Sequence, residues 1–256
     1  MKISKALSLF VGSSLLIVSC WAQSAQPAQT AKPDMTLAGN IHTTDDPEVL
    51  RETQIAVDAH NHLALVWWVP FEFWAYSAKK RGNDPEKTRQ NLKALKDYTV
   101  VGVFAANVSA LGSFDYVTPA DLQKKLFIRD SDGQEYAALT DISGDAKNLA
   151  DLIRPMLGNA MGRAGENFAM LFFPAKTKTG KLIADEGTKG SFTVVLKDVL
   201  GETETDFAWH TPLTSFSEPR YCPAGKERVH ADWDYCPWHG VKLQSTSAPV
   251  NVRASK

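Results

Sequence analysis

The sequence has little net charge, few cysteines and only one long apolar run. Its 256 residues include 28 Lys and Arg against 29 Asp and Glu, so the formal net charge is −1. This balance gives no broad attraction to phosphate backbones, which argues against a nucleic-acid-binding protein. The one long uncharged apolar run, residues 6–18, lies at the N-terminus, which excludes a protein with several membrane spans. A Gly-x-Ser-x-Gly elbow and a Gly-rich phosphate loop are both missing, so two common enzyme motifs are excluded.

The N-terminus has the pattern of a bacterial export signal: a cationic start (MKISK), the apolar run, and then a polar stretch. Residues 16–20 (LIVSC) resemble the lipobox of bacterial lipoproteins. That resemblance implies that residues 1–19 are removed and that Cys20 becomes lipidated on the periplasmic side of a bacterial membrane. Plain cleavage after Ala22 is the alternative. Residues 20–45, rich in Gln, Ala, Thr, Pro and Ser, are expected to form a flexible tether.

Residues 46–216 are predicted to form an α+β domain. Asp-Pro pairs at 46–47 and 84–85 predict helices over 47–56 and 85–97. Residues 63–69 (LALVWWV) predict a buried strand, residues 71–80 a helix, and residues 145–157 a helix that Pro155 kinks or ends. Further strands are predicted at 99–108, 125–129, 135–139, 168–173, 181–184 and 192–196. Since regular helices do not separate these strands, we expect an antiparallel β-sheet or sandwich flanked by a few helices, with a knuckle-like tail.

Two features inside the domain have an alternative interpretation. Residues 67–76 contain six aromatic residues, which favours a core segment but is also typical of a ligand platform. Residues 130–135 (DSDGQE) superficially resemble a calcium loop, but Ile128 occupies the first ligand position. The Asp132-Gly133 pair instead predicts a hairpin turn.

The tail, residues 217–256, contains two similar segments, YCPAG at 221–225 and YCPWHG at 235–240. Each resembles the zinc knuckle of zinc ribbons, in which two Cys-Pro-x-Cys-Gly turns face each other and supply four ligands. The resemblance implies Cys222, Cys236 and His239 as ligands. In the first segment the second ligand position is Gly225, which has no donor. His230, between the segments, is the candidate for a fourth ligand.

Three states of the tail are compatible with this pattern. A disulfide between Cys222 and Cys236 would close a loop of 15 residues (222 to 236 inclusive) and contribute about 3 kcal/mol of stability. Zinc bound through Cys222, Cys236, His239 and His230 is the second state, and two reduced thiols are the third. The missing ligand at position 225 favours the disulfide in an oxidising compartment.

A second candidate metal site lies at Asp58, His60 and His62. Histidines two residues apart in a strand point to the same face, so both could contact one metal ion. The segment resembles the Asp-x-His-x-His start of metal-dependent amidohydrolases, which implies a metal-activated water as nucleophile. A barrel of that class needs ~250 residues, whereas 199 run from Asp58 to the C-terminus (256 − 58 + 1). The alternative is a polar entry to the buried strand.

The sequence therefore predicts a non-catalytic cell-envelope lipoprotein with a binding or scaffolding role. We assign it no catalytic residues and expect no cofactor, with zinc in the tail as the alternative. The expected partners are the membrane, through the lipid anchor, and an envelope protein, peptide or glycan. The competing hypothesis is a small metal-dependent hydrolase that uses Asp58, His60 and His62.

Overall fold

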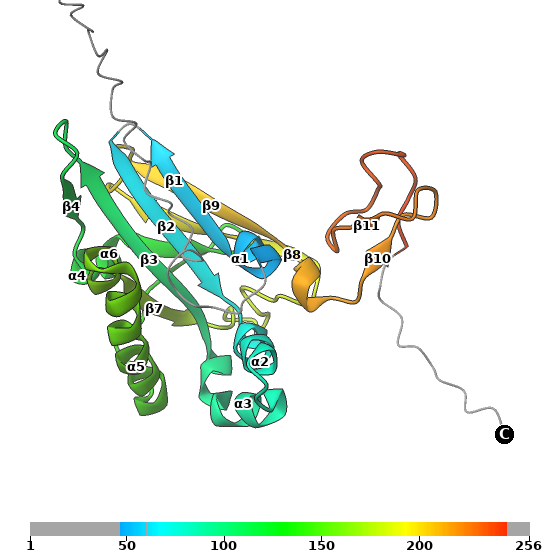
Figure 1. Cartoon of the computed structure of the whole chain (residues 1–256), viewed down its shortest axis with the longest axis horizontal. Coiled ribbons are helices and arrows are strands. Elements are labelled where there is room, and N and C mark those ends of the chain that lie inside the picture. Colours follow the sequence, from blue (N-terminus) through cyan, green and yellow to red (C-terminus); the bar gives the residue numbers. More distant parts are fainter. Residues whose placement is uncertain (1–46, 60, 245–256) are drawn as a thin grey trace, which may run out of the picture. The chain divides into compact units, whose positions relative to one another are not determined.

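The computed structural model describes residues 47–59 and 61–244 (Figure 1). They form antiparallel sheets and the helices α1 to α6, which confirms the predicted α+β class. The predicted export signal, the tether and Cys20 lie outside the described residues. Among the described helices, none has the length and apolar character needed to cross a bilayer.

The first sheet has five strands arranged around the long strand β3 (Tyr98–Val108). β1 (Gln54–Ala59) and β2 (His62–Val69) form a hairpin, and β2 pairs with β3. On the other side of β3, β7 (Ala169–Pro174) pairs with its first half and β4 (Phe114–Tyr116) with its end. All of these pairings are antiparallel, as the sequence predicts.

The second sheet has the strand order β6 (Glu135–Ala137), β5 (Leu126–Arg129), β8 (Gly190–Lys197) and β9 (Glu204–Thr211). The predicted hairpin between β5 and β6 is confirmed. Gly133 in its turn has a φ of +81°, in the left-handed region that glycine adopts without steric cost.

The helices cover the first sheet and connect the strands. They are α1 (Pro47–Thr53), α2 (Phe71–Lys80), α3 (Pro85–Asn91), α4 (Pro119–Lys125), α5 (Gly144–Met161) and α6 (Arg163–Glu166), with 3-10 turns η2 (Lys93–Asp97) and η3 (Thr214–Phe216). α3 begins where the sequence predicts, because the Asp84 carboxylate accepts hydrogen bonds from the first backbone N–H groups. α5 continues past Pro155, which corrects the predicted helix end. Pro155 is exposed, so the carbonyl group that its missing N–H leaves free can bond to water.

The apolar run of β2 is buried on both faces. Val66 and Trp68 pack in the core between the two sheets. Leu65 and Trp67 point the opposite way, into a second core beneath the helices that includes Phe73 of α2. Because successive side chains enter different cores, the run needs no polar alternation. Of the six aromatic residues at 67–76, Trp67, Trp68 and Phe73 are therefore core residues, and the other three are half-buried and pack against the core.

Further element predictions need correction, and one strand was missed. The helix predicted over 85–97 is divided into α3 and the 3-10 turn η2. The first helix ends at Thr53 rather than 56, because the next residues pair with β2 as strand β1. Residues 181–184 do not form the predicted strand, and their β-pairing is limited to one antiparallel bridge between Lys176 and Leu182. Strand β9 was not predicted, although its burial alternates along Phe207, Trp209 and Thr211.

Candidate metal centre

The described part of the tail, residues 217–244, is called the ribbon below. It has two short antiparallel strands, β10 (Arg220–Tyr221) and β11 (Arg228–Val229). Its own core cluster consists of Cys222, Val229, Cys236 and Leu243. The ribbon thus buries two cysteines among very few apolar side chains.

The two predicted knuckles have the same backbone turn. In the first, the Lys226 N–H donates to the Cys222 carbonyl at 2.9 Å, and in the second the Gly240 N–H donates to the Cys236 carbonyl at 2.8 Å. Both Lys226 and Gly240 have a φ of +64°. In each knuckle the cysteine N–H also donates to the carbonyl five residues further on. Two sequence segments that resemble knuckles therefore do fold as matching turns.

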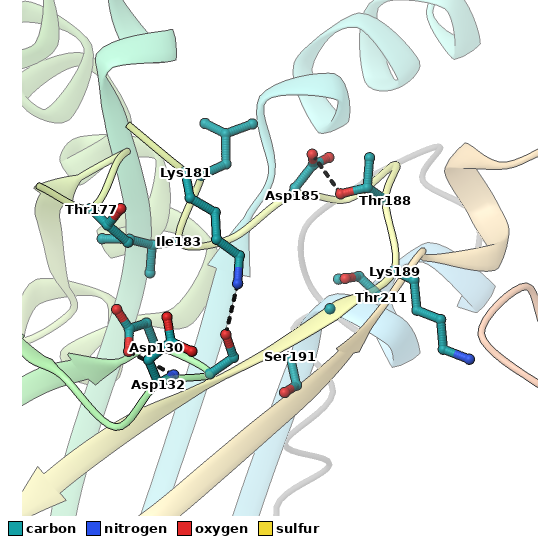
Figure 2. A pocket seen from close by; sticks show the side chains of 13 residues that line it. Asp130, Asp132, Thr177, Lys181, Ile183, Asp185, Thr188, Lys189, Ser191 and Thr211 are labelled. Atoms are coloured by element: carbon teal, nitrogen blue, oxygen red, sulfur yellow. Dashed lines mark hydrogen bonds between the residues drawn. The ribbon is translucent and has the colours of Figure 1, made fainter. Parts of the chain in front are cut away.

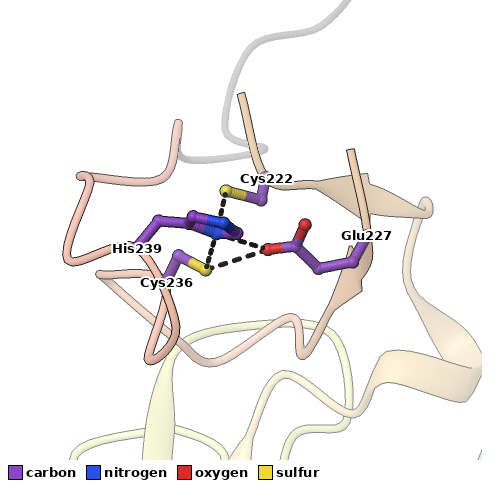
Figure 3. A group of neighbouring side chains, drawn as sticks. All are labelled: Cys222, Glu227, Cys236 and His239. Carbon is purple, nitrogen blue, oxygen red and sulfur yellow. Dashed lines mark hydrogen bonds and ion pairs between the residues drawn. The ribbon is translucent and has the colours of Figure 1, made fainter. Parts of the chain in front are cut away.

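Four potential metal ligands converge between these turns. One donor atom each from Cys222, Glu227, Cys236 and His239 lies within 4.8 Å of the others (Figure 3). The His239 Nδ1 atom is 3.6 Å from the Cys222 Sγ, 3.4 Å from the Cys236 Sγ and 3.0 Å from the Glu227 Oε1. The Cys236 thiol donates to the same Glu227 oxygen at 3.1 Å.

These separations are close to the edges of a zinc coordination tetrahedron. Zinc binds sulfur at about 2.3 Å and nitrogen or oxygen at about 2.0–2.2 Å. Tetrahedral angles then place sulfur and nitrogen about 3.6 Å apart and nitrogen and oxygen about 3.4 Å apart. The two S–N distances of 3.6 and 3.4 Å fit this geometry, whereas the N–O distance of 3.0 Å and the S–O distance of 3.1 Å are shorter and need an outward shift of the Glu227 carboxylate.

Glu227 occupies the space that the missing ligand at position 225 would fill. A Cβ atom on Gly225 would overlap the Glu227 carboxylate and the His239 ring. Glycine at this position therefore opens room for a carboxylate that arrives from two residues further along the chain. The first knuckle has exchanged a ligand at position 225 for one at position 227.

Hydrogen bonding shifts the pKa values of side chains within the cluster. The Cys236 thiol and the backbone N–H of Glu227 itself bond to the carboxylate and lower the pKa of Glu227 to about 2. Burial raises the pKa of the Cys236 thiol, and the neighbouring Glu227 carboxylate raises it further. A cation that binds at this place has to displace the thiol proton, so its affinity increases with pH.

An arginine ties the ribbon together around the cluster. The Arg220 guanidinium donates to the backbone carbonyls of Ala231, Trp233 and Gln244. Its fixed planar fork can satisfy several carbonyls at once, which a lysine could not do. The segment between the knuckles and the end of the ribbon are thereby held to β10.

His230 lies apart from the cluster. Its Nδ1 atom is 3.3 Å from the Thr214 Oγ1 and 3.9 Å from the Glu52 carboxylate, and its ring packs on Trp233. The fourth donor is Glu227, which the sequence analysis missed. Its signal was an acidic residue two positions after Gly225, the glycine that replaces the knuckle ligand.

The expected disulfide is absent from the described part of the chain, where Cys222 and Cys236 are both free. The ring of His239 lies between the two sulfur atoms in Figure 3 and contacts both. The two cysteines are close, as the knuckle resemblance implied, but they surround a histidine nitrogen rather than face each other.

The structure does not bring Asp58 and His62 together. The chain turns back at residues 60–61, and Asp58 pairs with Leu63 whereas Ala59 pairs with His62. Cross-strand partners share a face, so the Asp58 and His62 side chains point to opposite faces of the sheet. His62 is instead hydrogen-bonded to Asn107, with a distance of 2.8 Å. His60 lies outside the described residues.

The pocket in Figure 2 is separate from the cluster. It has a volume of about 130 Å³ and lies between the β5–β6 turn and the segment that leads into β8. Lys181 donates to the Ser131 hydroxyl at 3.0 Å, and Asp185 accepts from Thr188 at 2.8 Å. The first of these hydrogen bonds joins the segment before β8 to the β5–β6 turn, and the second lies within that segment.

Comparisons with known proteins add one distant similarity. No protein-family model matches the chain, and neither does any curated protein. Among solved structures, a crystal structure of a DUF4426 family protein from Pseudomonas aeruginosa PAO1 is similar to this chain with a TM-score of 0.29. The two are 10% identical, and the match covers 62% of this chain and 93% of the other.

Proposed function

We propose that the chain is a non-catalytic protein of the bacterial cell envelope with a binding or scaffolding role, whose ribbon is held by one zinc ion. The ligands are Cys222, Glu227, Cys236 and His239. The observation that carries this proposal is the convergence of two thiols, one imidazole and one carboxylate within 4.8 Å.

The donor types favour zinc over other divalent cations. Thiolate and imidazole ligands in a tetrahedral set suit Zn²⁺, whereas Ca²⁺ and Mg²⁺ require mostly oxygen ligands. Four protein ligands complete the tetrahedron and leave no position for a reactive water, which distinguishes a structural zinc site from a catalytic one. The site therefore supports a scaffold rather than a hydrolase.

The ribbon also needs such a cross-link. Its core cluster has four residues, two of which are the cysteines themselves. Domains below about 40 residues usually require disulfides or metals, because they bury too little apolar surface. The free energy of binding a structural zinc ion becomes free energy of folding in such small modules.

Zinc titration of the reduced full-length mature protein tests the proposal. We expect one equivalent of Zn²⁺ by native mass spectrometry and loss of binding in Cys236→Ser and His239→Ala. Glu218→Ala, which removes an exposed carboxylate of the ribbon, is the matched control and keeps the full affinity. If the wild type retains no more zinc than Cys236→Ser, the metal proposal is wrong.

An exchange of ligand positions tests the role of Glu227. Glu227→Ala should weaken zinc binding, and Gly225→Ala should do so too, because the added Cβ overlaps the carboxylate. The double variant Gly225→Cys/Glu227→Ala places a thiol at the usual knuckle position, but its Cβ still overlaps the His239 ring, so binding should return only in part. Tight binding by Glu227→Ala alone would exclude the carboxylate as a ligand.

The envelope location rests on the N-terminal signal. Cleavage and lipidation at Cys20 would anchor the mature chain, since a multiply acylated cysteine binds membranes more firmly than a single acyl chain. We expect the wild type to partition into detergent and Cys20→Ala to appear in the soluble fraction. A soluble wild type would instead favour cleavage after Ala22.

A further inference from the structure

We infer that zinc controls the docking of the ribbon onto the α+β domain. The docking element is the segment between the knuckles, residues 228–235, named the docking loop. The receiving surface consists of α1 and η3. This inference rests on the proposed function, because it assigns a regulatory role to the same zinc ion.

The docking loop supplies a set of contacts from the ribbon to the domain. Arg228 pairs with Glu48 of α1 at 2.9 Å. The N–H of Ala231 donates to the Thr214 hydroxyl of η3 at 3.1 Å in a buried hydrogen bond. His230 contacts the same hydroxyl, 3.3 Å away. All of these contacts come from three residues within the stretch 228–231.

A further ion pair, Lys189 to Asp234 at 2.6 Å, joins the other end of the loop to the segment before β8. Both of its side chains are about two-thirds exposed, at 64% and 66%, and those of the Arg228–Glu48 pair are 41% and 40% exposed. Exposed ion pairs contribute about 0–1 kcal/mol each. Such contacts cannot order a free loop by themselves, so docking depends on how far the loop is ordered beforehand.

The zinc ligands supply that order. Glu227 directly precedes the docking loop and Cys236 directly follows it. Binding one ion to both residues fixes the two ends of the loop, and the conformational entropy of closing it no longer opposes the contacts. Without the ion, hydrogen bonds such as that from the Cys236 thiol to Glu227 are left to hold the two ends, so the loop is ordered less firmly before it docks.

Docking covers a site on the domain that is already organised. The Glu52 carboxylate accepts hydrogen bonds from the backbone N–H groups of Thr214 and Ser215 at 2.9 and 2.8 Å. Its side chain is 11% exposed, and His230 lies beside it. Release of the loop would uncover this acidic site at the end of the domain that leads to the predicted anchor.

Thermodynamic reciprocity provides the test. If zinc strengthens docking by a given factor, docking strengthens zinc binding by the same factor, so a variant that docks poorly must bind zinc more weakly. We expect the full-length double variant Glu48→Gln/Thr214→Val, which changes no ligand, to bind Zn²⁺ at least about fivefold more weakly than the wild type. Glu202→Gln, an exposed carboxylate in the β8–β9 turn, is the matched control and keeps the wild-type affinity.

Hydrogen exchange follows the docking directly. Chelation of the wild type should accelerate exchange of the Ala231 amide, while core amides of β3 and β8 stay protected. If the double variant binds zinc with unchanged affinity, or if Ala231 is equally protected with and without metal, the coupling is wrong and the zinc site stands. If the wild type binds no zinc, the proposed zinc site is wrong, and the coupling that depends on it is wrong as well.

Discussion

The α+β domain and the ribbon are stabilised by different means. The domain has two apolar clusters, one between the sheets and one beneath the helices, with many side chains wholly removed from water. The ribbon has one small cluster and a set of polar ligands. In the domain many weak contacts add up, whereas in the ribbon four ligands replace them.

This difference predicts where each region is sensitive. A domain held by dispersed packing loses part of its free energy of unfolding with each truncated side chain, and the loss affects the whole unit. A module held by a metal loses its structure when one ligand is removed, and the loss stays local. A substitution in the core should therefore lower the stability of the whole domain in part, whereas a substitution of one ligand should disrupt the ribbon alone.

The largest effect is expected in the core between the sheets. Trp68 is 1% exposed and packs edge-on against Phe192, with ring centroids 4.8 Å apart. Trp68→Ala should lower the free energy of unfolding of the domain by about 3–5 kcal/mol, measured by chemical denaturation. Leu111→Ala, at a residue that is 98% exposed, should change it by less than about 0.5 kcal/mol. Equal losses in both variants would contradict a packing origin.

The second effect is large but local. Cys222→Ser removes one zinc ligand and should abolish the protection of ribbon amides from hydrogen exchange. The thermal transition of the domain should remain where it is in the wild type, because none of the cluster residues packs into the two apolar cores. A parallel loss of protection in β3 would show that the ribbon and the domain fold as one unit.

Sequence patterns predicted the domain well where one physical rule dominates. The run at 63–69 was identified as a buried strand because an apolar segment of that length has few alternatives. The Asp84 cap and the Asp132-Gly133 turn were found because both depend on local hydrogen bonding or local backbone angles. The helix end at Thr53 was missed because pairing with β2, a tertiary interaction, overrides local helix signals.

The candidate site was predicted only in part for a similar reason. Cys222, Cys236 and His239 follow from the knuckle pattern, which is local. Glu227 belongs to the cluster because Gly225 has no side chain to fill the space and the chain turns at Lys226 with a positive φ. This arrangement depends on the folded backbone and cannot be read from the local motif. The side chains of Asp58 and His62 point to opposite faces because a hairpin turn, which the sequence analysis did not predict, lies between the two residues.

The third prediction compares the two knuckles with each other. Lys226 and Gly240 occupy equivalent positions with the same φ of +64°, a region that costs residues with a Cβ atom about 1–2 kcal/mol. Lys226→Gly should therefore stabilise the ribbon by up to about 1 kcal/mol, and Gly240→Lys should destabilise it by about the same amount. Hydrogen exchange of ribbon amides at fixed free zinc measures both changes. Shifts of the same sign would show that the two turns are not equivalent.

The smallest effect is the pH dependence of stability. As the pH falls, the domain should lose a destabilising charge, whereas the ribbon should lose its zinc. Burial raises the pKa of Glu186, and the nearby carboxylates of Asp185 and Glu72 add to this shift, while the N–H of Glu72 donates to Glu186 at 3.2 Å. A carboxyl group with a raised pKa is harder to ionise in the folded state than in the unfolded state. At neutral pH, where the group is ionised, its negative charge therefore lowers the stability of the domain by the full amount. That cost disappears as the pH falls through the folded pKa towards the ordinary glutamate value of about 4.3.

Glu186→Gln removes the charge and keeps an oxygen that accepts from the Glu72 N–H. It should raise the melting temperature of the domain slightly at pH 7, and the gain should vanish near pH 4, whereas Glu202→Gln should show no such trend. The ribbon should respond in the opposite sense, because protons compete with zinc for the thiolates and the imidazole as the pH falls. A gain from Glu186→Gln that is equal at both pH values would exclude the buried charge as its cause.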